Sequence, residues 1–341
     1  VDQKLYSSTI NPNLSHFAII ENYLKEFLKH YKLKDVDFII HARDEIPNDL
    51  NLSEKILSVP AFRMSNDTEF LYEKNTLLLP DAYLMKIWVD LSRRMDKSYK
   101  EGQWKNKENK IFWRGGTSGK GKNQPYEFYN YKLTNIGKLP RLTLVILSKL
   151  YPDLIDAKFI SHPQIAKNKD GKNLRRVLDR LFGKTIKYNK TLKEEEHLKY
   201  KYLISIDGET CAWLRVPWIM LSGSVLVKQE SSKIEWFYPA LKPYIHYVPV
   251  KENLSDIFTQ IEWMKNNDEK MQEIAYNAHE FIKKEVMPEH LDSYMAIILD
   301  EYHKIQKDKE IKITITPTEE MGSLSILVAL LTNRVYEKVL K

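Results

Sequence analysis

The chain has 341 residues, of which 43% are hydrophobic and 11% aromatic, so it can bury a large core and is long enough for two domains. No apolar run reaches the about 20 residues that a membrane-spanning helix needs, and the run at residues 325–331 is too short. The 53 basic and 46 acidic residues give a net charge of +7, but the two signs are interspersed and no stripe of arginines alternates with aromatic residues. This pattern argues against sequence-specific nucleic-acid binding and is compatible with a local pocket for an anionic ligand.

The amino-terminal part of the chain predicts an α/β block. Residues 36–42 read as a strand, and Pro80 marks the start of a helix predicted over residues 81–95. Residues 97–110 are polar and contain no aliphatic side chain, which predicts a linker between two domains. The ends of the chain, before residue 37 and after residue 307, receive no assignment.

A second block alternates strands and helices. Strands are predicted at residues 111–114, 157–160, 202–206, 224–227 and 244–248, with helices at residues 141–150 and around Arg215 between them. Residues 254–306 read as successive helices. Such alternation predicts a mostly parallel sheet, and the ligands of these sheets bind beyond the carboxyl ends of the strands.

The most informative stretch begins at Asp207 and Gly208, directly after strand 202–206. Glycine frees the backbone for a tight loop, and the helix that follows carries Arg215 between apolar residues. A lone arginine on an apolar helix is costly to bury without an anion. The stretch therefore predicts an anionic ligand, such as a diphosphate, at the end of the strand.

Three more residues fit the same chemistry. Asp44 follows strand 36–42 and so is predicted at its carboxyl end, where a carboxylate can accept a proton. Arg114 follows a strand and precedes Gly115, so its guanidinium can reach a phosphate over bare backbone. Arg141 opens a helix after Pro140 and adds its charge to a positive helix end.

Residues 116–123 suggest an alternative function. They nearly fit the P-loop pattern G-x4-G-K-[ST], but Asn123 lacks the hydroxyl that binds magnesium, and Gln124-Pro125 continues poorly into a helix. A P-loop-like phosphotransferase is therefore one alternative. A glycine-lysine loop without catalytic function is another, and the same loop can also cover the phosphates of a donor with its backbone amides.

The sequence offers little for a metal site. Asp35 and Asp37 form a D-x-D pair, but they precede an apolar strand where metal-binding carboxylates would follow one, so they read as solvated residues. The histidines and Cys211 show no spacing suited to zinc. A single cysteine forbids an intrachain disulfide, which favours a reducing compartment or a fold independent of oxidation. The first residues show no signal-peptide pattern, so we expect a cytoplasmic location, with a secretory origin as the alternative.

Several motifs together resemble glycosyltransferase family 90, which contains Rumi-type protein O-glucosyltransferases, fungal capsule xylosyltransferases and bacterial lipopolysaccharide-modifying enzymes. The resemblance covers roughly residues 37–307. Its motifs are Ile40-His41-Ala42-Arg43-Asp44, Phe112-Trp113-Arg114-Gly115, Lys201-Tyr202, Asp207-Gly208, Arg215, Gly223-Ser224-Val225, Glu235-Trp236-Phe237-Tyr238-Pro239 and residues 243–250, PYIHYVPV.

The resemblance implies an α/β GT-B fold, with two Rossmann-like domains that face an interdomain cleft. Residues 1–105 would form the acceptor-side domain, residues 106–288 the nucleotide-sugar domain, and residues 289–341 helices that cross back to the first. It also implies an inverting, metal-independent enzyme without cofactor. This enzyme would move glucose or xylose from UDP-glucose or UDP-xylose to a hydroxyl of a glycan, lipopolysaccharide or protein. An inactive nucleotide-sugar-binding protein is the rival reading.

The resemblance assigns roles residue by residue. Asp44 matches the base that takes the proton of the acceptor hydroxyl. The residues expected to bind the donor are Arg114, Gly115, Thr117, Ser118, Arg141, Asp207, Gly208, Arg215, Ser224 and Glu235. Of these, Asp207 would orient ribose or sugar hydroxyls and Glu235 would contact ribose.

Overall fold

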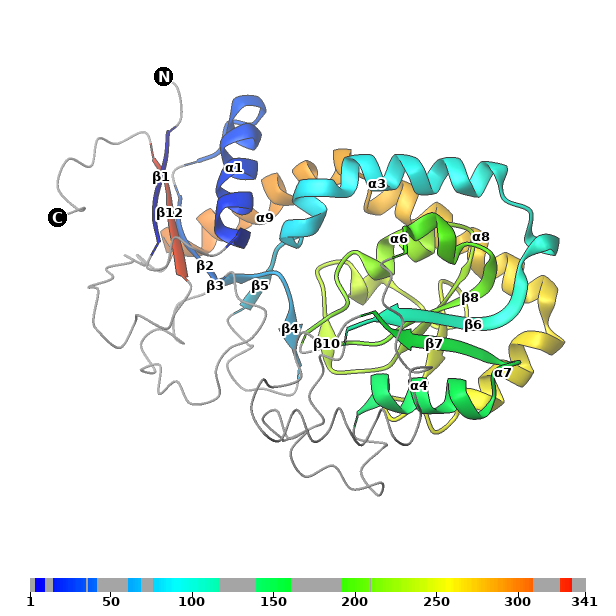
Figure 1. Cartoon of the computed structure of the whole chain (residues 1–341). Helices are drawn as coiled ribbons and strands as arrows, with labels where there is room; N and C mark the ends of the chain where they lie inside the picture. The colour runs from blue at the N-terminus through cyan, green and yellow to red at the C-terminus, as the bar shows by residue number, and fades with distance from the viewer. Residues whose placement is uncertain are drawn as a thin grey trace. The chain divides into compact units, whose positions relative to one another are not determined.

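The chain divides into two compact units, whose elements are labelled in Figure 1. The computed structural model describes residues 4–9, 15–34, 36–41, 61–68, 76–116, 139–160, 192–208, 210–308 and 326–332. The first unit comprises Val1–Val89, Lys233–Pro239 and Val286–Lys341, and the second comprises Asp90–Ser232 and Ala240–Glu285. This division differs from the expected segments, because it falls inside a helix and because a short internal piece joins the first unit.

The first unit is built on a five-stranded mixed sheet in the order β1-β12-β2-β3-β5. Its strands are β1 (Lys4–Thr9), β12 (Ile326–Thr332), β2 (Val36–His41), β3 (Ala61–Arg63) and β5 (Thr76–Leu78). Strands β2, β3 and β5 are parallel, whereas β12 runs antiparallel to both β1 and β2. The strand predicted at residues 36–42 is confirmed, and the sheet is completed by strands from both chain ends.

Helices α1 (Ser15–His30) and α9 (Pro288–Asp308) pack with this sheet. Tyr23 of α1 donates a hydrogen bond of 2.6 Å to Asp292 of α9, and the ring of Tyr302 of α9 lies 5.1 Å from that of Phe62. A two-stranded ribbon of β4 (Asn66–Asp67) and β10 (Lys233–Ile234) brings the internal piece into the first unit. Residues far apart in the chain therefore share one core.

The linker predicted at residues 97–110 is wrong. Helix α3 (Ala82–Glu101) includes the first residues of this segment. The 3₁₀ turn η2 (Trp104–Asn106) and the start of strand β6 (Glu108–Gly115) include most of the others. Pairs of opposite charge one turn apart support the helix without aliphatic residues, for example Lys100 with Asp96 at 2.7 Å. Trp104 packs against the core of the second unit and donates to Asp268 at 2.9 Å.

The second unit confirms the predicted parallel α/β organisation. Its five-stranded sheet has the order β11-β9-β8-β6-β7, and all pairs are parallel. With β6, the strands are β7 (Ile155–Phe159), β8 (Tyr200–Ser205), β9 (Val225–Gln229) and β11 (Val248–Val250). Helices α4 (Pro140–Leu150) and α6 (Arg215–Leu221) lie on opposite faces of this sheet (Figure 1). Every residue of strands β8 and β9 is buried, as expected for a sheet covered on both faces.

One strand prediction, at residues 244–248, is corrected. Residues 244–246 form a turn that the Tyr244 amide closes by donating to the carbonyl of Tyr247 at 2.7 Å, and the strand begins only at Val248. The predicted helices of residues 254–306 are confirmed as α7 (Ile257–Asn266), α8 (Asp268–Glu285) and α9. In the described part of the chain, no helix combines the length and apolar character needed to cross a membrane.

Candidate functional site

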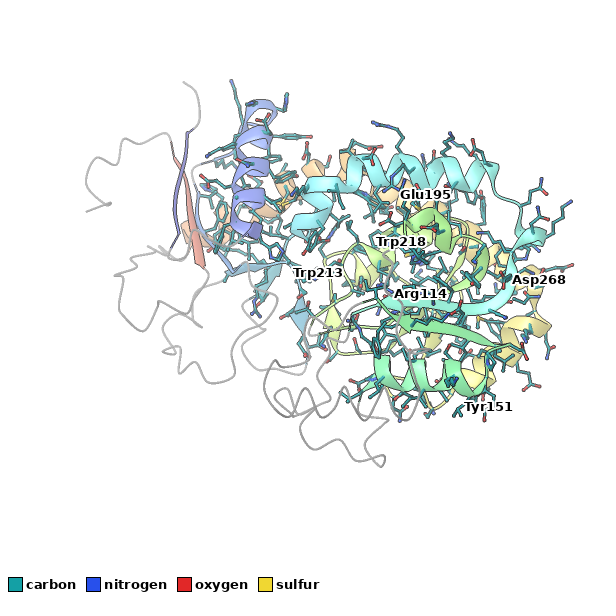
Figure 2. The ribbon with its side chains drawn as sticks, in the orientation of Figure 1. Arg114, Tyr151, Glu195, Trp213, Trp218 and Asp268 are labelled. Carbon is teal, nitrogen blue, oxygen red and sulfur yellow. The ribbon has the colours of Figure 1, made fainter. Side chains whose placement is uncertain are left out.

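The candidate site lies at the carboxyl edge of the sheet in the second unit, where β6 ends at Gly115 and β8 ends at Ser205 (Figure 2). Parallel strands bring their carboxyl ends to the same edge, and helices that follow the strands begin there. Helix α4 begins at Pro140 and helix α6 at Arg215, so the two predicted arginines of these helices come to the edge from opposite faces of the sheet.

Arg215 and Arg141 form a pair of cations around one tryptophan. Arg215 donates to the carbonyl of Arg114 at 2.9 Å, and Arg141 donates to the carbonyl of Ile206 at 3.0 Å. Their guanidinium carbons lie 5.7 Å and 5.8 Å from the ring centre of Trp113. No carboxylate of the described residues forms an ion pair with Arg215. The structure thus brings together two of the predicted phosphate-binding arginines.

The electrostatics of Arg215 favour an anionic ligand. Burial, together with the positive charge of Arg141, lowers the pKa of Arg215 to about 9. A lowered arginine pKa means that the surroundings disfavour its positive charge, so a bound anion would restore the balance. Burial, with the charges of Arg215 and Arg114, also lowers the pKa of nearby His197 to about 3, so this imidazole is neutral and offers no competing cation.

Trp113 adds a hydrogen-bond donor that the sequence reasoning did not single out. The side chain is only 1% exposed, and its Nε1 atom has no hydrogen-bond partner among the residues that the structure describes. A Cβ atom on Gly115 would lie 2.3 Å from Cζ2 of this indole, so Gly115 leaves room for the ring at the strand end. A buried N–H donor with two guanidinium groups near its ring suits the oxygen atoms of an anion. The only sequence signal was its place in the motif Phe112-Trp113-Arg114-Gly115.

Arg114 differs from the other two arginines because it already has an acidic partner. Its guanidinium lies 3.0 Å from the carboxylate of Asp156 and 4.1 Å above the ring of Phe112, and its side chain is 6% exposed. Burial alone would raise the pKa of Asp156, but the hydrogen bond and charge of Arg114 lower it below its usual value. Arg114 therefore supports the strand end structurally, and its predicted phosphate contact stays a prediction.

Asp207 and Gly208 lie at the same edge, as predicted. The Asp207 amide donates to the side chain of Gln229 on β9 at 2.9 Å, and the hydroxyl of Ser231 donates to the Asp207 carboxylate at 2.5 Å. The Gly208 amide donates to the carbonyl of Thr210 at 3.0 Å and closes the loop. These contacts hold a carboxylate directly after Ile206, whose carbonyl accepts from Arg141.

Ser224 lies apart from this group, and its donor-binding role stays a prediction. It precedes β9 and therefore lies at the amino edge of the sheet. Its hydroxyl donates to the carbonyl of Tyr200 at 2.9 Å and accepts from Lys107 at 2.8 Å, and both of these residues lie at the amino ends of strands. The sequence pattern placed Ser224 at the start of a strand, which already implied the edge opposite the site.

The remaining predicted residues lie elsewhere. Glu235 belongs to the first unit, where it is buried and accepts a hydrogen bond of 3.0 Å from the hydroxyl of Tyr238. Asp44, Thr117 and Ser118 fall outside the described residues, as do Asp35 and the body of the near P-loop sequence. Among the residues that the structure describes, no group of three or more histidine, cysteine, aspartate or glutamate side chains is arranged to hold a metal ion.

The chain is similar in sequence to protein O-glucosyltransferases. Protein O-glucosyltransferase 2 of Danio rerio is 25% identical over 319 residues, which are 92% of this chain and 55% of the relative. Protein O-glucosyltransferase 1 of Homo sapiens is 26% identical over 297 residues, 84% of this chain and 66% of the relative. The chain thus spans between about half and two thirds of the length of these relatives.

The sequence identity to solved structures is lower than the identity to these relatives. The Anabaena protein HepE in complex with UDP and glucose has a TM-score of 0.44 and 11% identity, over 87% of this chain and 76% of that one. A glycosyltransferase from Rickettsia africae has a TM-score of 0.44 and 14% identity, over 86% of this chain and 83% of that one.

The model of glycosyl transferase family 90 matches residues 1–321, so the chain belongs to this family.

Proposed function

We propose that this chain is a glycosyltransferase that moves a sugar from a UDP-sugar to a hydroxyl group of an acceptor. The observation that carries the proposal is that Arg141 and Arg215 lie 5.8 Å and 5.7 Å from the ring centre of Trp113, at the sheet edge where α/β proteins bind ligands, and that the N–H of this indole has no partner among the described residues. All three groups are donors or cations, which suits the diphosphate of a nucleotide-sugar. Membership of glycosyl transferase family 90 supports the same reading.

The reaction needs one base and one site of positive charge. The acceptor oxygen attacks the anomeric carbon from the face opposite the diphosphate, and the bond between that carbon and the phosphate oxygen breaks. The acceptor proton passes to the carboxylate of Asp44, and UDP leaves with the bonding electrons, so the configuration inverts. Arg141 and Arg215 stabilise the charge that grows on the leaving diphosphate, which is the role a divalent metal plays in other transferases. Metal independence is therefore part of the proposal.

The substrates belong to the proposal as well. The names of the relatives favour glucose as the transferred sugar and a protein hydroxyl as the acceptor. Xylose as the sugar, and a glycan or lipopolysaccharide as the acceptor, are the alternatives, because selectivity between such sugars rests on a few pocket contacts. Asp207, held by Ser231 and Gln229, suits the hydroxyls of ribose or of the sugar. In a GT-B arrangement the first unit, with Asp44, would serve the acceptor.

The test of the donor site is a calorimetric titration with UDP. We expect binding to be the same in EDTA and in magnesium, and Arg215→Ala to weaken it by roughly 1.5–3 kcal/mol because a charge-assisted hydrogen bond is lost. Arg93→Ala removes an exposed arginine of the same unit and is the matched control, with unchanged affinity expected. Loss of binding in EDTA would contradict the metal-free site, and unchanged affinity of Arg215→Ala would contradict the arginine site.

The base is tested separately from binding. Asp44→Asn keeps the shape of the side chain but cannot take up a proton, so we expect turnover to fall by about 10²-fold or more while UDP affinity stays constant. Sugar transfer at the wild-type rate would show that Asp44 is not the base. Donor hydrolysis without transfer to any acceptor would separate an active enzyme with the wrong acceptor from an inactive binding protein.

A further inference from the structure

Trp213 stands apart from the other tryptophans of the chain. The sequence contains seven tryptophans, and six of them contact an identified partner through the indole ring or its N–H group. These contacts are Trp88 to the Val286 carbonyl at 2.7 Å, Trp104 to Asp268 at 2.9 Å, and ring contacts of Trp113 with Phe159, Trp218 with His197, Trp236 with Tyr294 and Trp263 with Tyr244. Within the described part of the chain, the indole of Trp213 makes neither kind of contact, although the residue is partly buried.

The backbone of Trp213 is also unusual. Its φ angle of 49° lies in the left-handed region, which a bulky side chain adopts only at a cost. Strain of this kind persists where the surrounding structure fixes it, and it gathers at ligand-binding sites. Here the carbonyl of Trp213 accepts from the amide of Val216 at 3.3 Å in the first turn of α6, so the strained residue is anchored at the start of that helix.

Trp213 is close to the candidate site in the sequence. It precedes Arg215 by two residues in the connection that begins at Asp207. Figure 2 labels Trp213 together with Arg114 of strand β6. The same short connection therefore carries an arginine that has no acidic partner among the described residues, a carboxylate that suits hydroxyl groups, and an indole that contacts no ring and no hydrogen-bond partner among those residues. A nucleotide-sugar has three parts with these same needs: a diphosphate, hydroxyl groups and a flat base.

We propose that Trp213 stacks on the pyrimidine base of the nucleotide donor. The inference rests on the proposed function and adds to it the residue that distinguishes a nucleotide from a bare diphosphate. A base offers a flat π-face that an indole can cover, and such stacking needs no hydrogen bond to a particular base atom. The Asp207 carboxylate, at the other end of the connection, suits the hydroxyl groups of the sugar.

The experiment compares three ligands on the full chain: inorganic pyrophosphate, UDP and UDP-glucose. Trp213→Gly removes the ring but keeps the left-handed backbone at no steric cost, so the variant should unfold at the same temperature as wild type or higher. We expect its Kd for UDP and for UDP-glucose to rise by the same factor, about 5- to 100-fold, with no change for pyrophosphate. Trp213→Phe should keep most of the affinity, and Tyr276→Ala, which removes a 54% exposed aromatic of α8, should change nothing.

Each other outcome has a distinct meaning. A loss for UDP-glucose alone would place the ring against the sugar and overturn the inference. An equal loss for all three ligands would show that Trp213 acts only by holding the Arg215 helix, and unchanged affinity for all three would show no contact at all, so both results also overturn it. If wild type binds neither pyrophosphate nor UDP, the proposed donor site fails and the stacking falls with it.

Discussion

Two arginines close together in the second unit show how a single neighbouring carboxylate changes what a side chain can do. Arg114 lies 3.0 Å from Asp156, whereas the hydrogen bond of Arg215 goes to a backbone carbonyl, that of Arg114 itself. Among the described residues, a carboxylate thus compensates the charge of Arg114, and none compensates that of Arg215. In the sequence the two residues look alike, because Arg114 lies near the end of a strand and Arg215 begins the helix after another strand. The fold shows that Arg114, but not Arg215, has a carboxylate beside it among the described residues.

This difference predicts separate effects of substitution on stability and binding. Arg114→Met removes the nearest cation from the partly buried Asp156, which keeps Tyr200 at 3.0 Å and Lys158 at 3.7 Å, so we expect the free energy of unfolding to fall by about 3 kcal/mol. Urea unfolding measures this loss, and the double variant Arg114→Met with Asp156→Leu should lose less than the sum of the single variants. A variant as stable as wild type would contradict the structural role of Arg114.

Gly115 supports a second prediction, which concerns Trp113. Gly115→Ala places a methyl group about where the indole lies, since the Cβ would come within 2.3 Å of Cζ2. The ring must move, so we expect a loss of about 1–3 kcal/mol in stability and weaker UDP binding, because both guanidinium carbons lie less than 6 Å from the ring centre, at 5.8 Å and 5.7 Å. Adding Trp113→Phe removes the clashing part of the ring and should restore stability without restoring UDP affinity. Unfolding curves and UDP titrations of the single and double variants separate the two effects.

Lys107 predicts a pH dependence at the opposite edge. Burial lowers its pKa from an ordinary value of 10.5 to about 8, while its ammonium donates to Leu198 and Ser224. Between these two pH values the unfolded chain binds more protons than the folded one, so the contribution of this group to stability rises with pH. Relative to Lys107→Met, wild type should therefore gain about 2 kcal/mol between pH 8 and pH 10.5. Parallel stability curves of the two proteins over this range would show that the lysine is not perturbed.

For single residues, the sequence predicts the location in the fold where that location follows from the residue's position in a strand or helix. Asp207 follows a strand and Arg141 opens a helix, and both come to the carboxyl edge as the rule for parallel sheets requires. Trp113 was missed because its importance depends on an N–H group without a partner, which only atomic contacts reveal. Ser224 shows the limit of a motif, because its position directly before β9 places it at the other edge of the sheet.

At the scale of elements, local patterns predicted the second unit far better than the first. Strands β6, β8 and β9 are short apolar runs between loops and helices, and each is found where it was expected. Strand β12 is different, because it pairs with β2 from the far end of the chain. No local periodicity reports such a pairing, and the same apolar run was considered in sequence only as a membrane span that was too short.

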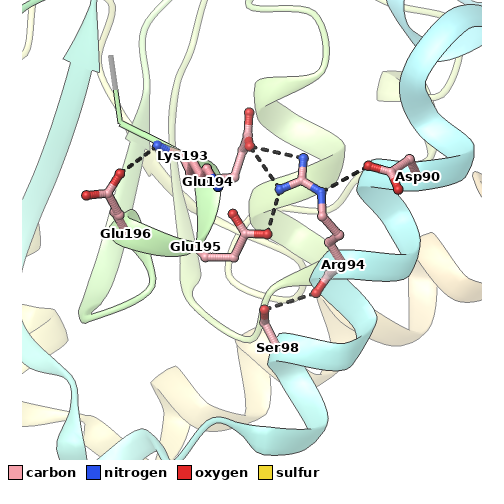
Figure 3. Close-up of polar contacts among 7 residues, drawn as sticks. All are labelled: Asp90, Arg94, Ser98, Lys193, Glu194, Glu195 and Glu196. Carbon is pink, nitrogen blue, oxygen red and sulfur yellow. Dashed lines mark hydrogen bonds and ion pairs between the residues drawn. The ribbon is translucent and has the colours of Figure 1, made fainter. Parts of the chain in front are cut away.

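Helix α3, whose residues from Asp90 on belong to the second unit, carries a charge network that can be tested at this scale. Arg94 of α3 contacts Asp90, Glu194 and Glu195 at 3.1, 3.2 and 2.5 Å, as Figure 3 shows, and so ties α3 to the 3₁₀ turn η6 (Glu194–His197). Burial alone would raise the pKa of Glu195, but the turn's own backbone and Arg94 lower it, so this carboxylate stays charged. The side chains are about a third exposed, so the network should stabilise the protein only modestly.

We therefore expect Arg94→Ala to lower the free energy of unfolding by about 1 kcal/mol at low salt and by less at 1 M NaCl, because salt screens exposed charges. The control is Lys97→Ala, which removes a single exposed pair to Glu101 at 3.8 Å and should have no measurable effect. An effect of Arg94→Ala that is as large at high salt as at low salt would mean that packing, not charge, connects α3 to η6.

At the scale of the whole molecule, the division into units separates the candidate donor site from the rest of the chain. Arg141, Arg215, Asp207 and Trp113 all belong to the second unit, and that unit has its own sheet and its own buried core. The first unit has a separate sheet built from both ends of the chain. We therefore expect donor binding to stabilise the second unit directly, whether or not an acceptor is bound.

The last prediction follows from this separation. UDP that binds only the folded second unit should stabilise it by about 2.7 kcal/mol at a hundredfold excess over Kd, which for a unit of its size corresponds to a shift in Tm of about 5–10 °C. Hydrogen exchange should then slow in β8, β9 and the first turn of α6, while exchange in β12 of the first unit stays unchanged. The Arg215→Ala variant should show neither effect. Equal protection of β12 and β9 would mean that UDP acts on both units, and the donor site would have to include residues of the first.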